Sequence, residues 1–175
     1  MRAMSDQPST YIEPFVLANN DSMVERQVPL NGMQRLAGLV VEATGEAAVS
    51  LHFGADQLGL RVMQGTVAAP VVVRCERCLK LMTVDVVADV NVGLVKNNEQ
   101  AENLPGQYEP LLLESDEPVS LTELVEDELI LSLPIAPRHE MDAACVSLDD
   151  YTAEDEPQEE KKNPFAALAA LKEKH

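Results

Sequence analysis

The stretch Val84-Asp85-Val86-Val87-Ala88-Asp89-Val90-Asn91-Val92 decides the fold class of this chain. Apolar residues occupy every even-numbered position, whereas Asp85, Asp89 and Asn91 occupy odd-numbered ones. Because successive side chains of a strand point to opposite faces, the pattern predicts a long strand with one buried and one solvated face. Strands of this kind are typical of antiparallel sheets.

Shorter runs around this stretch also have a composition typical of strands. They are the alternating Val49, Leu51 and Phe53, the alternating Leu58, Leu60 and Val62, the β-branched Val71, Val72 and Val73, and a short apolar run at residues 111–113. Runs of this composition predict strands. We therefore predict an α+β fold, with a mainly antiparallel sheet or a small open barrel and a few packed helices.

Two segments carry helix signals. Residues 30–41 have apolar side chains at helical spacing, which predicts a short amphipathic helix with Asn31 as its N-cap. Residues 120–123 read Ser-Leu-Thr-Glu, a capping-box pattern that predicts a second helix ending before Pro134. The acidic residues 126–128 on this second helix are interpreted as its solvated face.

The ends of the chain differ from the middle. Residues 1–20 lack periodicity and are expected to be loosely ordered, within a predicted α+β domain of residues 1–148. Residues 149–162 are strongly acidic, which predicts a disordered linker. Residues 163–175 begin with Asn-Pro, a helix-start signal, and place Phe165, Leu168 and Leu171 on one face. Because so short a helix is unstable alone, these side chains are predicted to dock on the domain or a partner.

Charge and hydropathy restrict the possible partners. The 175 residues include 30 acidic and 13 basic side chains, for a net charge of -17. This charge disfavours DNA and any large RNA-binding surface, and it favours basic proteins. The sequence has no apolar stretch that could cross a membrane, and residues 1–6 lack the apolar run of a secretory signal. We therefore predict a cytoplasmic protein.

Residues 75–78 read Cys-Glu-Arg-Cys, a spacing that lets both sulfurs face one zinc ion. His139 and Cys145 are the further ligands that the sequence offers. The alternative is ordinary thiols at a tight turn, with no cofactor required. A redox role would need the first Cys at a helix N-terminus, and the residues that follow have strand character instead.

Arg74, Arg77 and Lys80 surround the same turn in an otherwise acidic chain. They are candidates for contacting RNA phosphates at one place, and a solvated strand surface is the alternative. The sequence contains no Gly-rich phosphate loop, nucleophile elbow or His-Glu-x-x-His helix. We therefore expect no catalytic activity.

Four segments, in this order, resemble the YceD family. They are residues 75–78, Tyr108-Glu109-Pro110, the block 125–134 (Val-Glu-Asp-Glu-Leu-Ile-Leu-Ser-Leu-Pro), and residues 163–168 (Asn-Pro-Phe-Ala-Ala-Leu). The resemblance implies a bacterial protein involved in synthesis, processing or stability of large-subunit (23S) ribosomal RNA, with plastid relatives in plants. We thus predict a non-enzymatic ribosome-biogenesis factor that binds a ribosomal or assembly protein, large-subunit rRNA, or both. The alternatives are a zinc-binding or redox thiol protein and a metal-dependent rRNA-processing nuclease.

Overall fold

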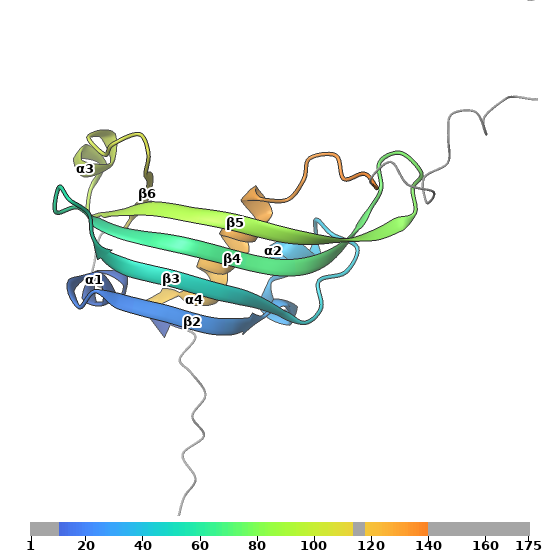
Figure 1. Cartoon of the computed structure of the whole chain (residues 1–175), viewed down its shortest axis with the longest axis horizontal. Helices are drawn as coiled ribbons and strands as arrows, with labels where there is room; N and C mark the ends of the chain where they lie inside the picture. The colour runs from blue at the N-terminus through green and yellow to red at the C-terminus, as the bar shows by residue number, and fades with distance from the viewer. Residues whose placement is uncertain (1–10, 114–117, 140–175) are drawn as a thin grey trace, which may run out of the picture. The chain divides into compact units, whose positions relative to one another are not determined.

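A five-stranded sheet forms the centre of the computed structural model, which describes residues 11–113 and 118–139. Its order is β2-β3-β4-β5-β6, with the bounds β2 (Ser22–Pro29), β3 (Glu46–Ala55), β4 (Arg61–Arg74), β5 (Leu81–Val95) and β6 (Glu109–Leu112). The pairings are antiparallel except that of β6, which runs parallel to β5. A second, two-stranded sheet pairs β1 (Tyr11–Ile12) with β7 (Val119–Ser120). Both sheets are open, so the predicted α+β class is confirmed without barrel closure (Figure 1).

The long β4–β5 hairpin confirms the alternation on which the fold prediction rests. Along β5, Val86, Ala88 and Val90 are buried, while the odd-numbered residues between them are exposed. The predicted runs at 58–62 and 71–73 are not separate strands, because Val62 and residues 71–73 belong to the single strand β4, whereas Leu58 and Leu60 lie in the segment before it. Gly65 (φ 151°) keeps β4 continuous, since a Cβ there would lie 2.0 Å from the carbonyl oxygen of Ser50.

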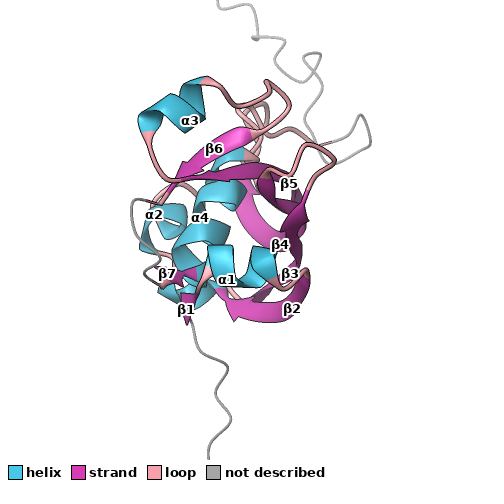
Figure 2. Cartoon of the chain, turned by 90° about the vertical axis from the view of Figure 1, so that its left-hand side faces the viewer, coloured by secondary structure: helices cyan, strands magenta, loops and turns pink. Residues whose placement is uncertain are grey.

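Helices cover one face of the five-stranded sheet and leave the other open (Figure 2). They are α1 (Pro14–Asn19), α2 (Gln34–Ala37) and α4 (Leu121–Leu131), while α3 (Asn98–Glu102) precedes β6 at one end of the sheet. The core between the helices and the sheet includes Leu36, Phe53, Val67 and Leu129, none of which exposes any surface. The opposite face carries polar side chains, as the sequence pattern predicts.

Two predictions for the N-terminal third were wrong. Within residues 1–20, the described part forms β1 and α1 rather than a loose segment. Residues 30–41 form a 3-10 turn (Leu30–Gly32) and the one-turn helix α2, separated by Met33, and Asn31 is not the N-cap. Met33 has a non-helical backbone (φ -91°, ψ 83°) and no exposed surface, so burial of its side chain interrupts the predicted helix.

Helix α4 begins as predicted, since the Ser120 hydroxyl accepts a hydrogen bond from the amide of Glu123 at 3.3 Å. The solvated face assigned to residues 126–128 is wrong at Glu126, which is only 5% exposed. Its carboxylate accepts hydrogen bonds from the backbone amides of Arg35 (2.7 Å) and Leu36 (3.0 Å) and pairs with the Arg35 guanidinium at 2.9 Å. This carboxylate therefore caps α2 from across the core.

Candidate functional site

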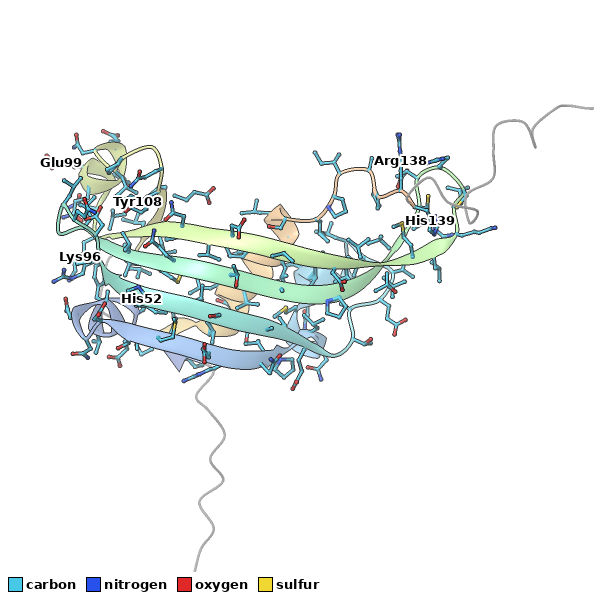
Figure 3. The ribbon with its side chains drawn as sticks, viewed as in Figure 1. His52, Lys96, Glu99, Tyr108, Arg138 and His139 are labelled. Carbon is cyan, nitrogen blue, oxygen red and sulfur yellow. The ribbon has the colours of Figure 1, made fainter. Side chains whose placement is uncertain are left out.

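The site lies where the β4–β5 hairpin turns and meets the segment that follows α4. We call residues 74–80 together with 137–139 the tip (Figure 3). Within the turn, the amide of Cys75 donates to the carbonyl of Lys80, and the amide of Leu79 donates to the carbonyl of Cys75, both at 2.9 Å. Leu79 has a left-handed backbone (φ 60°), which tightens the turn.

Both sulfurs of the turn lie close to the imidazole of His139. Cys75 is buried and Cys78 is half-buried, and the Cys78 Sγ lies 3.4 Å from His139 Nδ1. One ligand atom from each of Cys75, Cys78 and His139 lies within 4.8 Å of the other two. The structure therefore brings together three of the four predicted ligands, while Cys145 lies outside the described residues.

Backbone contacts hold the segment after α4 against the hairpin. The amide of Glu76 donates to the carbonyl of Pro137 at 2.8 Å. The Arg77 guanidinium reaches the carbonyl of His139 at 3.5 Å. Because Cys78 and His139 are 61 residues apart in sequence, this proximity is a property of the tertiary fold.

Basic side chains surround the thiols. Arg74, Arg77 and Lys80 are all exposed, as is Arg138, which the sequence analysis missed although it adjoins His139. These four make up half of the Lys and Arg residues in the described part of the chain. Arg74 also donates to the carbonyl of Leu79 at 2.8 Å, so it helps to hold the turn as well as carrying charge.

The remaining basic residues lie elsewhere in the described structure. Arg61 begins β4 and Lys96 follows β5, so both sit at the end of the hairpin opposite the tip (Figure 3). The open face of the sheet between the two ends is acidic, with Glu25, Asp85 and Asp89 exposed on it. Half of the described cations thus lie at the tip, beside the single carboxylate Glu76, whereas the open face carries exposed carboxylates.

The predicted docking residues Phe165, Leu168 and Leu171 lie outside the described residues, as do the predicted linker and terminal helix. Among the residues that the structure does describe, no helix has the length and apolar character needed to cross a membrane.

These features define a class: an open-sheet α+β protein with a Cys/His cluster among basic side chains at one end of its longest hairpin. The chain belongs to the YceD family, whose model, described as "Large ribosomal RNA subunit accumulation protein YceD", matches residues 63–172. A relative with that same name from Haemophilus influenzae (strain ATCC 51907 / DSM 11121 / KW20 / Rd) is 38% identical over 146 residues, covering 82% of this chain and 84% of its own length. No solved structure matches the chain significantly. The resemblance inferred from the four sequence segments is confirmed.

Proposed function

We propose that this protein is a non-enzymatic factor that supports accumulation of large-subunit ribosomal RNA and that its tip contacts RNA phosphates. The observation that carries the proposal is the cluster of exposed cations at the tip of a protein whose family is named for large ribosomal RNA subunit accumulation. Arg77 and Lys80 come from the hairpin turn and Arg138 from the segment after α4, which the bonds from Glu76 and Arg77 hold against that turn. Contacts of this kind position a protein on RNA without reading its sequence.

Electrostatics confines the contact to the tip. A net charge of -17 repels RNA from most of the molecule, so the energy gained at the tip must exceed repulsion from the rest. Counterion release makes such binding sensitive to salt, with a slope of about 0.7 per phosphate neutralised on single-stranded RNA. We therefore expect a small footprint on the RNA.

The open face suits a different partner. Glu25, Asp85 and Asp89 are exposed there, and the helices cover the opposite face (Figure 2). An acidic surface attracts basic proteins at long range, and this attraction is screened beyond about 10 Å at 0.1 M ionic strength. A basic ribosomal or assembly protein is the partner that we propose for this face.

The rival functions find little support in the described geometry. A redox role would place Cys75 at the start of a helix, but it lies between strands β4 and β5. A nuclease would need free carboxylates in a cleft, but Glu126 is committed to the amides of α2 and to Arg35. Neither the position of Cys75 nor the contacts of Glu126 favours catalysis.

The test uses a strain in which the gene is deleted. We expect the ratio of large-subunit to small-subunit rRNA to fall and the intact gene to restore it. The double variant Lys80→Ala, Arg138→Ala should restore it poorly and should recover less rRNA after crosslinking. Arg74 and Arg77 are left intact because each also bonds a backbone carbonyl of the tip.

The matched control is Arg61→Ala, Lys96→Ala, which removes the same charge from the opposite end of the same hairpin. It should restore the ratio as well as the intact gene does. A normal ratio in the deletion strain during both slow and fast growth would contradict the proposed function. Equal rRNA recovery with the two double variants would contradict the proposed contact between the tip and RNA.

A further inference from the structure

We propose that the outer edge of β5, at residues 81–89, binds an extended segment of a basic protein in which Lys or Arg alternates with apolar residues. The segment would add a strand to the sheet. This inference deepens the partner proposed above for the open face and rests on that proposal. It adds the place of contact, the conformation of the bound segment and its sequence pattern.

Strand β5 is much longer than the strand beside it. Strand β6 pairs only with residues 92–95, so it covers one end of β5 (Figure 1). Next to that end, the side-chain amide of Asn91 donates to the carbonyl of Gln107, so the chain before β6 reaches this residue. Residues 81–89 therefore pair with β4 on one side and adjoin no strand of the described structure on the other.

Hydrogen bonds at the two ends of β5 show which backbone groups face outward. At the turn, the carbonyl of Lys80 accepts from the amide of Cys75, so it points toward β4. At the other end, the carbonyl of Val95 accepts from the amide of Leu113 at 2.8 Å, so it points away from β4. The register between β4 and β5 is continuous, and backbone direction alternates along an antiparallel strand. The odd-numbered residues of β5 therefore direct their N–H and C=O groups outward.

The outward groups of this edge belong to Leu81, Thr83, Asp85, Val87 and Asp89. Within the described part of the chain, no backbone or side-chain group bonds them. Residues 81–89 span about 27 Å, which is long enough to hold a segment of similar length. An unpaired edge of this kind is a template for an added strand.

The opposite edge of the sheet, along β2, carries features that obstruct pairing. Arg26 is half-buried and lies in the same alternation as the buried Val24 and Val28, and Pro29 ends the strand. An inward-pointing charge and a proline are both typical protection for an edge strand. Residues 81–89 contain neither a proline nor a basic side chain, and their register with β4 has no bulge. The edge of β5 is therefore better suited to pairing.

The side chains along this edge define the segment that it would bind. On the open face, Asp85 and Asp89 are exposed on either side of Val87. Neighbouring strands place opposed side chains about 5 Å apart, so Lys or Arg in the added strand would pair with these carboxylates. On the covered face, Met82 and Val84 are only half-buried, so apolar side chains of the added strand would complete their burial. Basic and apolar residues should thus alternate in the partner.

A second copy of this chain is disfavoured at the same edge. The antiparallel pairing that overlaps residues 81–89 completely places Asp85 opposite Asp85 of the other copy. Like charges directly opposite each other are destabilising, and each chain carries a net charge of -17. Charge therefore favours a basic partner over self-association.

The first test is hydrogen exchange of the full chain with a synthetic peptide, acetyl-Val-Lys-Val-Thr-Val-Lys-Val-amide. In the free protein, the outward amides of Thr83, Asp85 and Val87 should exchange fast, whereas the inward amides of Val84 and Val86 should exchange slowly. Peptide at about 1 mM should slow the outward amides by at least about tenfold. The control peptide, Lys-Lys-Val-Val-Thr-Val-Val with the same end groups, has the same composition without the alternation and should leave them unchanged.

Charge reversal tests the predicted pairing. The variant Asp85→Lys, Asp89→Lys should bind the lysine peptide at least about tenfold more weakly and should bind acetyl-Val-Glu-Val-Thr-Val-Glu-Val-amide instead. The matched control is Glu25→Lys, Glu46→Lys, which changes the net charge equally on β2 and β3. It should keep the preference for the lysine peptide, and fluorescence anisotropy of labelled peptides measures both affinities.

Backbone pairing is tested at Val87. Val87→Pro removes one outward amide and leaves the bonds to β4 in place, and proline is tolerated at such edge positions. Circular dichroism should show that the variant folds, and it should bind the lysine peptide at least about tenfold more weakly. Val87→Thr keeps the amide and should bind as the unmodified protein does.

Unchanged exchange of the outward amides at about 1 mM peptide would overturn the inference. So would equal slowing by the control peptide, or unchanged binding of the lysine peptide to Asp85→Lys, Asp89→Lys. Slow exchange of these amides in the free chain would show that a second copy or another part of the chain already covers the edge, and would also overturn it. A lowered rRNA ratio in the deletion strain without peptide binding would overturn the strand docking alone. A normal ratio together with peptide binding would overturn the proposed function alone.

Discussion

The two ends of the β4–β5 hairpin are held by different means. At the end that bears Arg61 and Lys96, side chains reach helix α1: the guanidinium of Arg61 donates to Asn19 at 2.8 Å, and the Lys96 ammonium lies 4.7 Å from the centre of the Phe15 ring. At the opposite end, Leu79 in the tip and Leu81 just after it expose more than half of their surface. The contacts there are polar and involve sulfur.

This difference separates folding from function. Burial of apolar surface is the dominant favourable term in folding, so the covered part of the sheet carries the stability. The tip adds little apolar burial, yet it gathers half of the described cations and the Cys/His cluster. The tip contributes little to stability but concentrates cations and the Cys/His cluster, so it is where we expect a functional contact.

The largest effect is expected in the core beneath α4. Leu129 has no exposed surface, so Leu129→Ala should lower the free energy of unfolding by about 2–5 kcal/mol. Leu81→Ala, at the start of β5 near the tip, should lower it by less than about 0.5 kcal/mol, because Leu81 is 55% exposed. Urea denaturation of the two variants measures the contrast. Similar losses for both would show that the tip is part of the stabilising core.

A smaller effect is expected at the carboxylate that caps α2. Glu126→Gln keeps the shape but removes the charge that pairs with Arg35 and accepts two amides, so stability should fall by about 1–3 kcal/mol. Asp127→Asn is the matched control, because Asp127 also pairs with Arg35 but is 53% exposed, and it should change stability much less. A larger loss of stability for Asp127→Asn than for Glu126→Gln would contradict the capping role assigned to Glu126.

The same carboxylate adds a pH dependence. Burial alone would raise the pKa of Glu126, but the amide of Leu36 and the bonds and charge of Arg35 outweigh it and hold the pKa below its ordinary value of 4.5. The contribution of Glu126 is therefore complete above pH 4.5 and is lost as the pH falls through the folded-state pKa. Glu128 acts in the opposite sense, because burial and the charges of Glu109 and Asp127 raise its pKa. Glu126→Gln should accordingly flatten the loss of stability measured below pH 4.5.

The smallest effect is expected within the turn. Leu79 has φ 60°, which costs free energy in a residue with a side chain, so Leu79→Gly should stabilise the protein by up to about 1 kcal/mol. Leu81→Gly, two residues later in regular strand geometry, should destabilise it by about 0.5–1 kcal/mol. Thermal unfolding of the pair gives the sign of each change. Destabilisation by both would mean that the left-handed turn is not strained.

Local patterns in the sequence determined much of the architecture. The alternation around Val86, Ala88 and Val90 predicts the buried face of β5, because side-chain direction in a strand depends only on position. Ser120 predicts the start of α4 in the same way, because the cap bonds an amide three residues away. The spacing of Cys75 and Cys78 likewise placed both sulfurs at one turn.

Only the tertiary structure decided which distant residues meet. Glu126 accepts hydrogen bonds from the amides of residues 35 and 36, about ninety residues away in sequence. Because these partners are so distant, the acidic run at residues 126–128 by itself predicted a solvated helix face. The parallel pairing of β6 with β5, and the arrival of Arg138 and His139 beside the hairpin turn, also depend on the path of the chain after α3 and α4. The physical reason is that periodicity and capping act over one or two turns of chain. Pairing across the fold depends instead on which buried surfaces the whole chain can cover at once.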